Sequence, residues 1–84
     1  MYYVYVLLSE KDNMFYTGYT ADLENRIEEH LNGKVNSTRY RLPLKLVYYE
    51  CSISQNDALH REKYLKSTYG KRYIKNRLKH FLKK

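Results

Sequence analysis

The protein has 84 residues and a formal net charge of +7, from 16 Lys or Arg and 9 Asp or Glu. An apolar fraction of 43% excludes a disordered chain, and the short length leaves room for only one core, so we expect a single domain over residues 1–84. The excess of positive charge favours a polyanion as the partner.

The amino-terminal segment predicts a β-hairpin. Residues 2–8 are rich in Tyr, Val and Leu, residues 15–19 are short and aromatic, and the polar stretch SEKDN lies between them. This pattern is typical of two strands joined by a turn.

The next segment predicts a helix. Apolar residues recur there at every fourth position: Leu23, Ile27 and Leu31. We expect this helix to span residues 22–32, with Thr20 or Asp22 as its amino-terminal cap and Gly33 as a left-handed stop.

A loop and a third strand follow. The stretch KVNSTRYRLP carries turn chemistry and predicts a loop with at most a short helical turn. Pro43 then leads into LKLVYYEC, which has the composition of a strand.

Two helices are predicted for the remainder. Ser54 and Asp57 form a capping pair that opens a helix to about Tyr69, ended by Gly70. A last helix over about 72–83 is expected to bury four apolar residues: Ile74, Leu78, Phe81 and Leu82. The order of strand, strand, helix, strand, helix and helix indicates a small α+β domain.

Cysteine content and hydropathy indicate the cellular compartment of the protein. The single cysteine, Cys51, excludes an intramolecular disulfide framework and a cysteine-based zinc site. The apolar runs are too short to cross a bilayer or to form the core of a signal peptide. We therefore expect a soluble cytoplasmic protein with no membrane partner and no organic cofactor.

One carboxylate interrupts an apolar helix stripe. Glu62 falls on the stripe marked by Ala58, Leu65 and Tyr69, and this position aims its side chain toward the core. A buried carboxylate is costly unless it is paired or bound to a cation. The pattern leaves open a salt bridge to a basic residue and a metal or catalytic role.

Arg26 and His30 are four residues apart and share a helix face beside the apolar stripe. They can point into a groove between helix and hairpin. An Arg and a His beside Glu29 are also typical of a solvated surface cluster, so both interpretations stay open.

Eleven tyrosines, with no Trp and two Phe, show a preference for rings that carry hydroxyls. Two tyrosine triplets frame the hairpin turn: Tyr3-Val4-Tyr5 and Tyr16-Thr17-Gly18. Together with later segments they resemble the GIY-YIG nuclease superfamily, and most closely its small stand-alone bacterial, UPF0213-like branch. The later segments follow in order: YTGYT, DLENR, Gly33, LPLKLVYYE and LHREKYLK.

The sequence departs from the superfamily pattern at three positions. Tyr3 stands where the name-giving glycine is expected, and Thr17 replaces isoleucine. Tyr19 stands where excision-repair relatives carry a lysine, which puts lysine-assisted activation in doubt. We expect no attached DNA-recognition domain, and therefore no reading of a defined target sequence by this chain alone.

The resemblance implies a three-stranded antiparallel sheet flanked by helices, and a DNA endonuclease that uses one Mg²⁺ or Mn²⁺. The implied catalytic residues are Tyr5, Tyr16, Arg26, His30, Glu62 and Asn76. Glu62 would be the metal ligand and Arg26 would hold the scissile phosphate. Tyr5 or Tyr16 would take a proton from the attacking water, His30 would relay or position it, and Asn76 would orient the metal ligand or the backbone.

Basic residues of the loop and the carboxyl-terminal region predict a nucleic-acid surface: Lys34, Arg39, Arg41, Lys71, Arg72, Lys75 and Arg77. Such contacts go to phosphates and carry no sequence information. We expect DNA as the main partner, a monomer or weak homodimer, and a role in DNA repair, recombination or foreign-DNA processing. The alternatives are a nucleic-acid-binding module with a vestigial site, a structural ribonucleoprotein component, and charges that serve only solubility.

Overall fold

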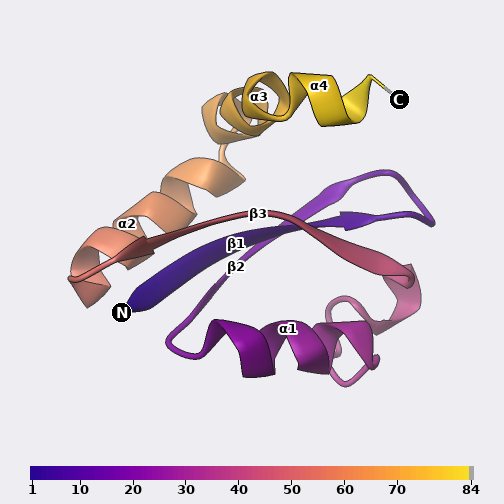
Figure 1. Ribbon diagram of the computed structural model, residues 1–84, viewed down its shortest axis with the longest axis horizontal. Helices are drawn as coiled ribbons and strands as arrows, with labels where there is room; N and C mark the ends of the chain where they lie inside the picture. The colour runs from indigo at the N-terminus through magenta and orange to yellow at the C-terminus, as the bar shows by residue number, and fades with distance from the viewer. Residues whose placement is uncertain (84) are drawn as a thin grey trace.

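A three-stranded antiparallel sheet lies between α1 on one side and α2, α3 and α4 on the other in the computed structural model (Figure 1). The structure describes residues 1–83, and Lys84 lies outside the described residues. The elements are β1 (Tyr2–Ser9), β2 (Phe15–Thr20), α1 (Leu23–Leu31), the 3-10 helix η1 (Arg39–Arg41), β3 (Leu44–Ser52), α2 (Gln55–Lys66), α3 (Thr68–Arg77) and α4 (Lys79–Leu82). The predicted α+β class, sheet and short helical turn are confirmed.

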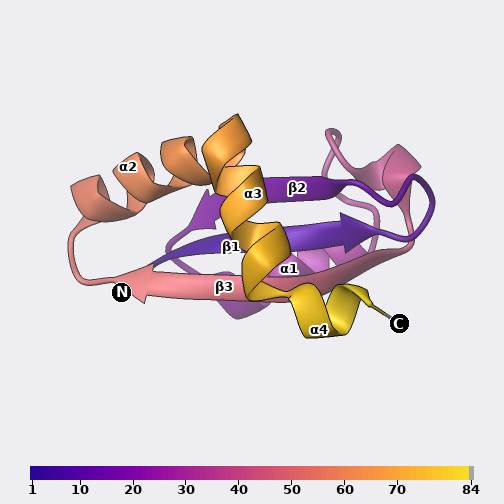
Figure 2. The same ribbon diagram turned by 90° about the horizontal axis from the view of Figure 1, so that it is seen from above.

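The central strand β1 pairs with both other strands, in the order β2-β1-β3. Tyr5 lies opposite Gly18 of β2 and Tyr49 of β3. Successive side chains of a strand point to opposite faces, so β1 contributes alternate residues to two layers. Seen from above, α2 and α3 cover one face of the sheet while α1 lies beneath it (Figure 2).

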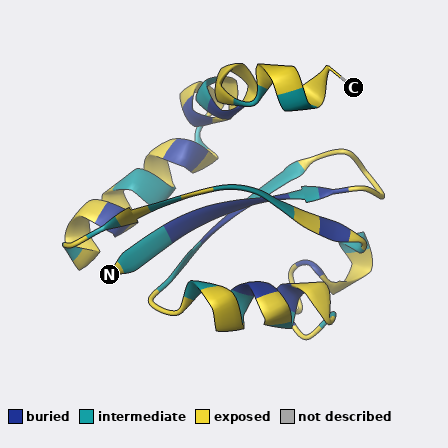
Figure 3. Cartoon of the chain, in the orientation of Figure 1, coloured by how far each residue is buried: buried dark blue, intermediate teal, exposed yellow. Residues whose placement is uncertain are grey.

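Each face of the sheet has its own core. The face toward α2 and α3 buries an apolar cluster: Val4, Val6, Ala58, Leu65 and Ile74. The face toward α1 buries a second cluster: Tyr5, Leu7, Ile27 and Leu44. Figure 3 shows the buried middle of β1 between these two layers.

Helix α1 confirms the predicted cap and stop. The Asp22 side chain accepts a hydrogen bond from the backbone N–H of Asn25, and Gly33 has a φ of +73°, in the left-handed region. Leu31, the last residue of the apolar repeat, is 46% exposed. The buried position of the last turn is His30, three residues after Ile27 rather than four.

The boundary between the last long helices differs from the prediction. Helix α2 ends at Lys66, and Ser67 caps α3 by accepting a hydrogen bond from the N–H of Gly70. Gly70 therefore does not stop a helix. A Cβ at this position would lie 2.1 Å from the carbonyl oxygen of Tyr64, so glycine is needed because α3 packs directly on the α2 backbone.

This boundary also corrects the burial of two residues. Tyr69, predicted to face inward, lies beyond the end of α2 and is 68% exposed. The expected continuous helix over 72–83 is interrupted at Leu78, and Leu82 of α4 is 39% exposed rather than buried. Within the described residues, no helix is long and apolar enough to cross a membrane.

Candidate active site

A buried hydrogen-bonded chain crosses the face of the sheet toward α1. The Tyr5 hydroxyl lies 2.7 Å from Nε2 of His30, and Nδ1 of His30 lies 2.8 Å from Oγ1 of Thr38. His30 and Thr38 are fully buried, and Tyr5 is 1% exposed. The interpretation of His30 as part of a solvated surface cluster is therefore wrong.

The charge state of His30 follows from its surroundings. Burial, assisted by the nearby Arg26 charge, lowers the pKa of His30 to about 4. The ring is therefore neutral at pH 7. A neutral imidazole donates one of its two hydrogen bonds and accepts the other, so Tyr5 and Thr38 complete its bonding capacity.

Gly18 leaves the space that the Tyr5 phenol occupies. It lies opposite Tyr5 in the hairpin, and a Cβ there would be 2.3 Å from both Cζ and the hydroxyl oxygen of Tyr5. No side chain fits at this distance unless the ring moves. The glycine of the second triplet thus allows the phenol to cross β2 and reach His30.

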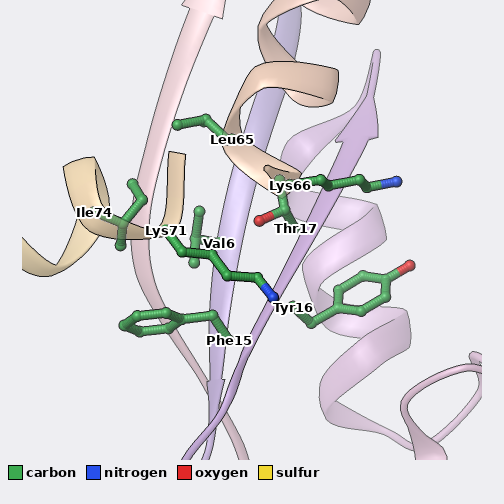
Figure 4. Close-up of a pocket in the computed structure, with 8 residues that line it drawn as sticks. All are labelled: Val6, Phe15, Tyr16, Thr17, Leu65, Lys66, Lys71 and Ile74. Carbon is green, nitrogen blue, oxygen red and sulfur yellow. The ribbon is translucent and has the colours of Figure 1, made fainter. Parts of the chain in front are cut away.

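Tyr16 flanks the same histidine but is more accessible than Tyr5. Its ring centroid lies 5.3 Å from that of His30, while the Tyr5 centroid lies 5.4 Å away. The Tyr16 hydroxyl accepts a long hydrogen bond, 3.4 Å, from Ser37. In Figure 4 this hydroxyl and the Lys66 amine extend to the same side, away from Phe15 and Ile74. The structure therefore brings both candidate tyrosines together around His30.

Arg26 lies beside the Tyr5 hydroxyl at the edge of this cluster. Burial raises the pKa of the Tyr5 phenol, whereas the Arg26 guanidinium lowers it. Arg26 is half-buried, and its Nη1 lies 3.0 Å from Oε1 of Glu29. The ion pair uses part of the guanidinium fork, which has five N–H donors in all, so donors remain for an oxyanion.

Glu62 lies on α2, which packs on the opposite face of the sheet from α1. Its side chain is 20% exposed, and its Oε2 lies 3.1 Å from Nζ of Lys66 one turn further on. Burial is the main cause of the raised pKa of Tyr5, and the negative charge of Glu62 adds a smaller contribution. The salt-bridge interpretation is present in the structure, and the partly open carboxylate also leaves a metal role possible.

The donors around Glu62 match one kind of metal site. The described residues contain no cluster of three or more His, Cys, Asp or Glu side chains that can enclose an ion. Mg²⁺ keeps several waters and commonly binds through one or two carboxylates plus substrate phosphate. A single carboxylate at a half-open position fits that chemistry and does not fit a closed structural zinc site.

A pocket opens next to Tyr16, between β2 and the α2–α3 junction. It has a volume of about 220 Å³. Its wall combines Val6, Phe15, Tyr16, Thr17, Leu65, Lys66, Lys71 and Ile74 (Figure 4). Two lysines thus stand at the mouth of a small pocket beside a candidate proton-accepting tyrosine, an arrangement suited to an anionic group.

The basic residues of the loop have different surroundings. Lys34 is exposed, and the Arg39 guanidinium lies 4.7 Å from the centroid of the exposed Tyr40 ring. Arg41 is bound to the hairpin turn, because its Nε donates to Oδ2 of Asp12 at 2.8 Å. Arg41 therefore has a structural contact in addition to its predicted role at nucleic acid.

The predicted residues of α3 do not all face the tyrosine cluster. Lys71 lines the pocket beside Tyr16, and both Lys71 and Lys75 line a neighbouring hollow. Arg72 and Arg77 are exposed. Asn76 is also exposed, and it lines a different hollow with Arg72, so the structure does not place it among the other candidate catalytic side chains.

Sequence reasoning gave no role to Thr38, Ser37 or Lys66. Thr38 sits in an irregular loop, and nothing in the local pattern indicates that its hydroxyl bonds His30. Gly18 did carry a signal, because a glycine inside a strand indicates a bulge or a close approach. Here the approaching group is the phenol of Tyr5.

Comparison with known proteins gives a consistent picture. The sequence matches the family described as the GIY-YIG catalytic domain over residues 1–80. A UPF0213 protein of Bacillus licheniformis is 41% identical over 80 residues, covering 90% of this chain and 81% of that protein. A UPF0213 protein of Clostridium perfringens is 48% identical over 67 residues, covering 79% and 71%. One of Haloquadratum walsbyi is 43% identical over 67 residues, covering 79% and 74%. No solved structure matches the chain.

Proposed function

The chain belongs to the GIY-YIG family, a nuclease superfamily, and from this premise we propose that it is an endonuclease that hydrolyses DNA phosphodiester bonds with one divalent cation. The observation that carries the proposal is the meeting of Tyr5, Tyr16 and His30 in one cluster with Arg26 at its edge. We place its role in DNA repair, recombination or foreign-DNA processing, with selection by DNA structure rather than by sequence.

Tyr16 is the better placed of the two tyrosines to take the proton of the attacking water. Tyr5 is 1% exposed and burial raises the pKa of its phenol, so the phenol stays protonated and is out of reach of an attacking water. Tyr16 lines an open pocket and does not share a hydrogen bond with His30.

The remaining groups orient the reaction. Tyr5, held by His30, positions the Arg26 guanidinium, and Arg26 binds the non-bridging oxygens of the scissile phosphate as their charge develops. Lys71 binds a neighbouring phosphate at the pocket mouth. Glu62 would hold the Mg²⁺ or Mn²⁺, which when bound supplies Lewis acidity at the phosphate.

The decisive experiment compares cleavage of supercoiled, nicked, branched and single-stranded DNA, and of RNA, with Mg²⁺, Mn²⁺ or a chelator. We expect metal-dependent cleavage of at least one DNA substrate. Cleavage in chelator at the same rate as with metal would contradict the role of the cation, and binding of all substrates without cleavage would identify a nucleic-acid-binding module.

A pair of variants separates the two interpretations of Glu62. Both Glu62→Gln and Lys66→Met remove the ion pair, but only Glu62→Gln removes the carboxylate. We expect Glu62→Gln to abolish metal-dependent cleavage while Lys66→Met retains the metal dependence. An equal loss in both variants, with equally lowered melting temperatures, would reduce Glu62 to a salt-bridge partner.

A further inference from the structure

A further hollow, outside the candidate active site, is formed by residues of α2 and α3. Its volume is about 450 Å³. It is lined by Tyr64, Tyr69, Arg72, Tyr73 and Asn76. None of these described lining residues is acidic, and the Tyr69 and Tyr64 side chains are 68% and 38% exposed. Three tyrosine rings thus line an exposed hollow, and no acidic side chain among the described lining residues would repel an anion.

Arginines lie against all three rings. The guanidinium of Arg61 lies 5.1 Å from the Tyr64 ring centroid and 4.9 Å from that of Tyr73, and Arg72 lies 5.7 Å from the Tyr69 centroid. Arg61 is itself fixed by an ion pair of 2.7 Å with Glu50. In the described part of the chain no carboxylate pairs with Arg72, so its charge remains available to a ligand.

The hollow and the pocket beside Tyr16 are both lined by residues of the α2–α3 junction. Neighbouring residues line the two depressions: Lys66 and Lys71 line the pocket beside Tyr16, whereas Tyr64 and Arg72 line the hollow. Both depressions are thus formed in part by the same stretch of chain, residues 64–76.

We propose that this hollow binds an unpaired nucleotide of the substrate, with its base stacked on Tyr69 and its phosphate on Arg72. The proposal rests on the proposed function in taking a nucleic acid as the ligand. Exposed aromatic rings beside arginines suit a nucleotide because every base has a π face and every phosphate a negative charge. The net charge of +7 favours such a polyanion over an acidic patch on a protein.

Binding can be measured without cleavage. We would titrate the protein into an end-labelled oligothymidylate of roughly ten nucleotides in chelator and follow fluorescence anisotropy. Tyr69→Ala is expected to weaken binding roughly 5- to 100-fold, the loss typical of removing one stacking ring. Tyr69→Phe should bind like the parent, since stacking does not need the hydroxyl. On an oligonucleotide of abasic sites the alanine and parent proteins should bind equally.

Two controls exclude trivial causes. Tyr49→Ala removes another exposed tyrosine, 54% exposed and located on β3, and should leave binding unchanged. The melting temperature of Tyr69→Ala should stay close to that of the parent because the side chain is largely solvated.

Each other outcome would overturn the proposal. Parent-like binding by Tyr69→Ala would show that no base stacks there, and an equal loss on the abasic strand would assign the hollow to backbone charge alone. Binding of polyglutamate that depends on Tyr69, with oligothymidylate binding unaffected, would assign it to a protein partner. None of these three outcomes affects the cleavage assay. The proposed binding at the hollow can therefore be wrong while the proposed nuclease activity is right.

Discussion

The two faces of the sheet take alternate side chains from the same strand and are held together by different interactions. Val4 and Val6 of β1 pack among aliphatic side chains beneath α2 and α3. Tyr5, between them in sequence, ends in a hydrogen bond to a buried histidine on the other face. Packing on the first face depends mainly on the volumes of its side chains. Packing on the second face also depends on the geometry of a hydrogen bond, which fixes the donor, the acceptor and the angle between them.

This difference predicts which face of the sheet tolerates substitution. An aliphatic core tolerates swaps that conserve volume, whereas a buried polar group left without its partner costs its full desolvation penalty. In the described part of the chain no buried side-chain nitrogen or oxygen lacks a hydrogen-bond partner. Variants matched across the two faces should therefore affect different properties.

The largest contrast is expected from removing one hydroxyl on each face. Tyr16→Phe should lower the single-turnover cleavage rate by roughly 10²- to 10⁴-fold, because it removes the proposed proton acceptor. Tyr48→Phe, on the face toward α3, should leave the rate within a few-fold of the parent. DNA affinity should change little in both variants. Equal cleavage rates for the parent and Tyr16→Phe would show that Tyr16 serves only packing.

The buried histidine should make stability depend on pH. Unfolding restores the ordinary pKa of about 6.5, so the unfolded chain binds more protons on His30 than the folded chain between pH 6.5 and 4. Stability should be full above pH 6.5 and fall as the pH drops toward 4, by at most roughly 3 kcal/mol.

Chemical denaturation at pH 7 and at pH 4.5 tests this, with His30→Gln as the reference that lacks the titrating ring. The pH-dependent loss should be smaller in the variant. Asp12 does not confuse the comparison, because its hydrogen bond with Arg41 lowers its pKa to about 2, below this window. Parallel losses in parent and variant would mean that His30 is not held neutral by burial.

A smaller effect is expected at the far end of the hydrogen-bonded chain. Thr38→Val keeps the shape but leaves Nδ1 of His30 without its partner, which should lower the free energy of unfolding by about 1–3 kcal/mol. Thr38→Ser keeps the hydroxyl and should recover most of that loss. If valine and serine cost the same, the methyl group rather than the hydrogen bond holds the loop in place.

The sequence predicted the apolar face and the hairpin better than the polar face. Strand alternation, the Asp22 cap and the Gly33 stop are local signals, and they led to the right elements. Thr38 was missed because its role depends on a contact with His30 that no local pattern records. His30 itself was placed beside the core, and only the packed structure shows that it is inside.

The error at the α2–α3 junction has a related cause. The sequence pattern predicts a helix stop at Gly70, the commonest role of glycine at such a position. Gly70 instead lets two helix backbones touch, which depends on tertiary packing. The predicted burial of Tyr69 is wrong for the same reason. The sequence pattern assigns Tyr69 to the inward face of the preceding helix, whereas it belongs to α3 and is exposed to solvent.

The smallest predicted effect comes from the apolar face. Ile74 is 1% exposed and packs in the cluster between the sheet and α3. Ile74→Val removes one methylene and should lower the free energy of unfolding by about 0.5–1.5 kcal/mol. Denaturant titration measures this loss. The cleavage rate should stay at the parental value, because Ile74 has no part in the hydrogen-bonded chain although it forms one wall of the Tyr16 pocket. A rate that falls further than the loss of folded protein explains would show that the two faces are coupled through the pocket, and that the aliphatic core also sets the position of Tyr16.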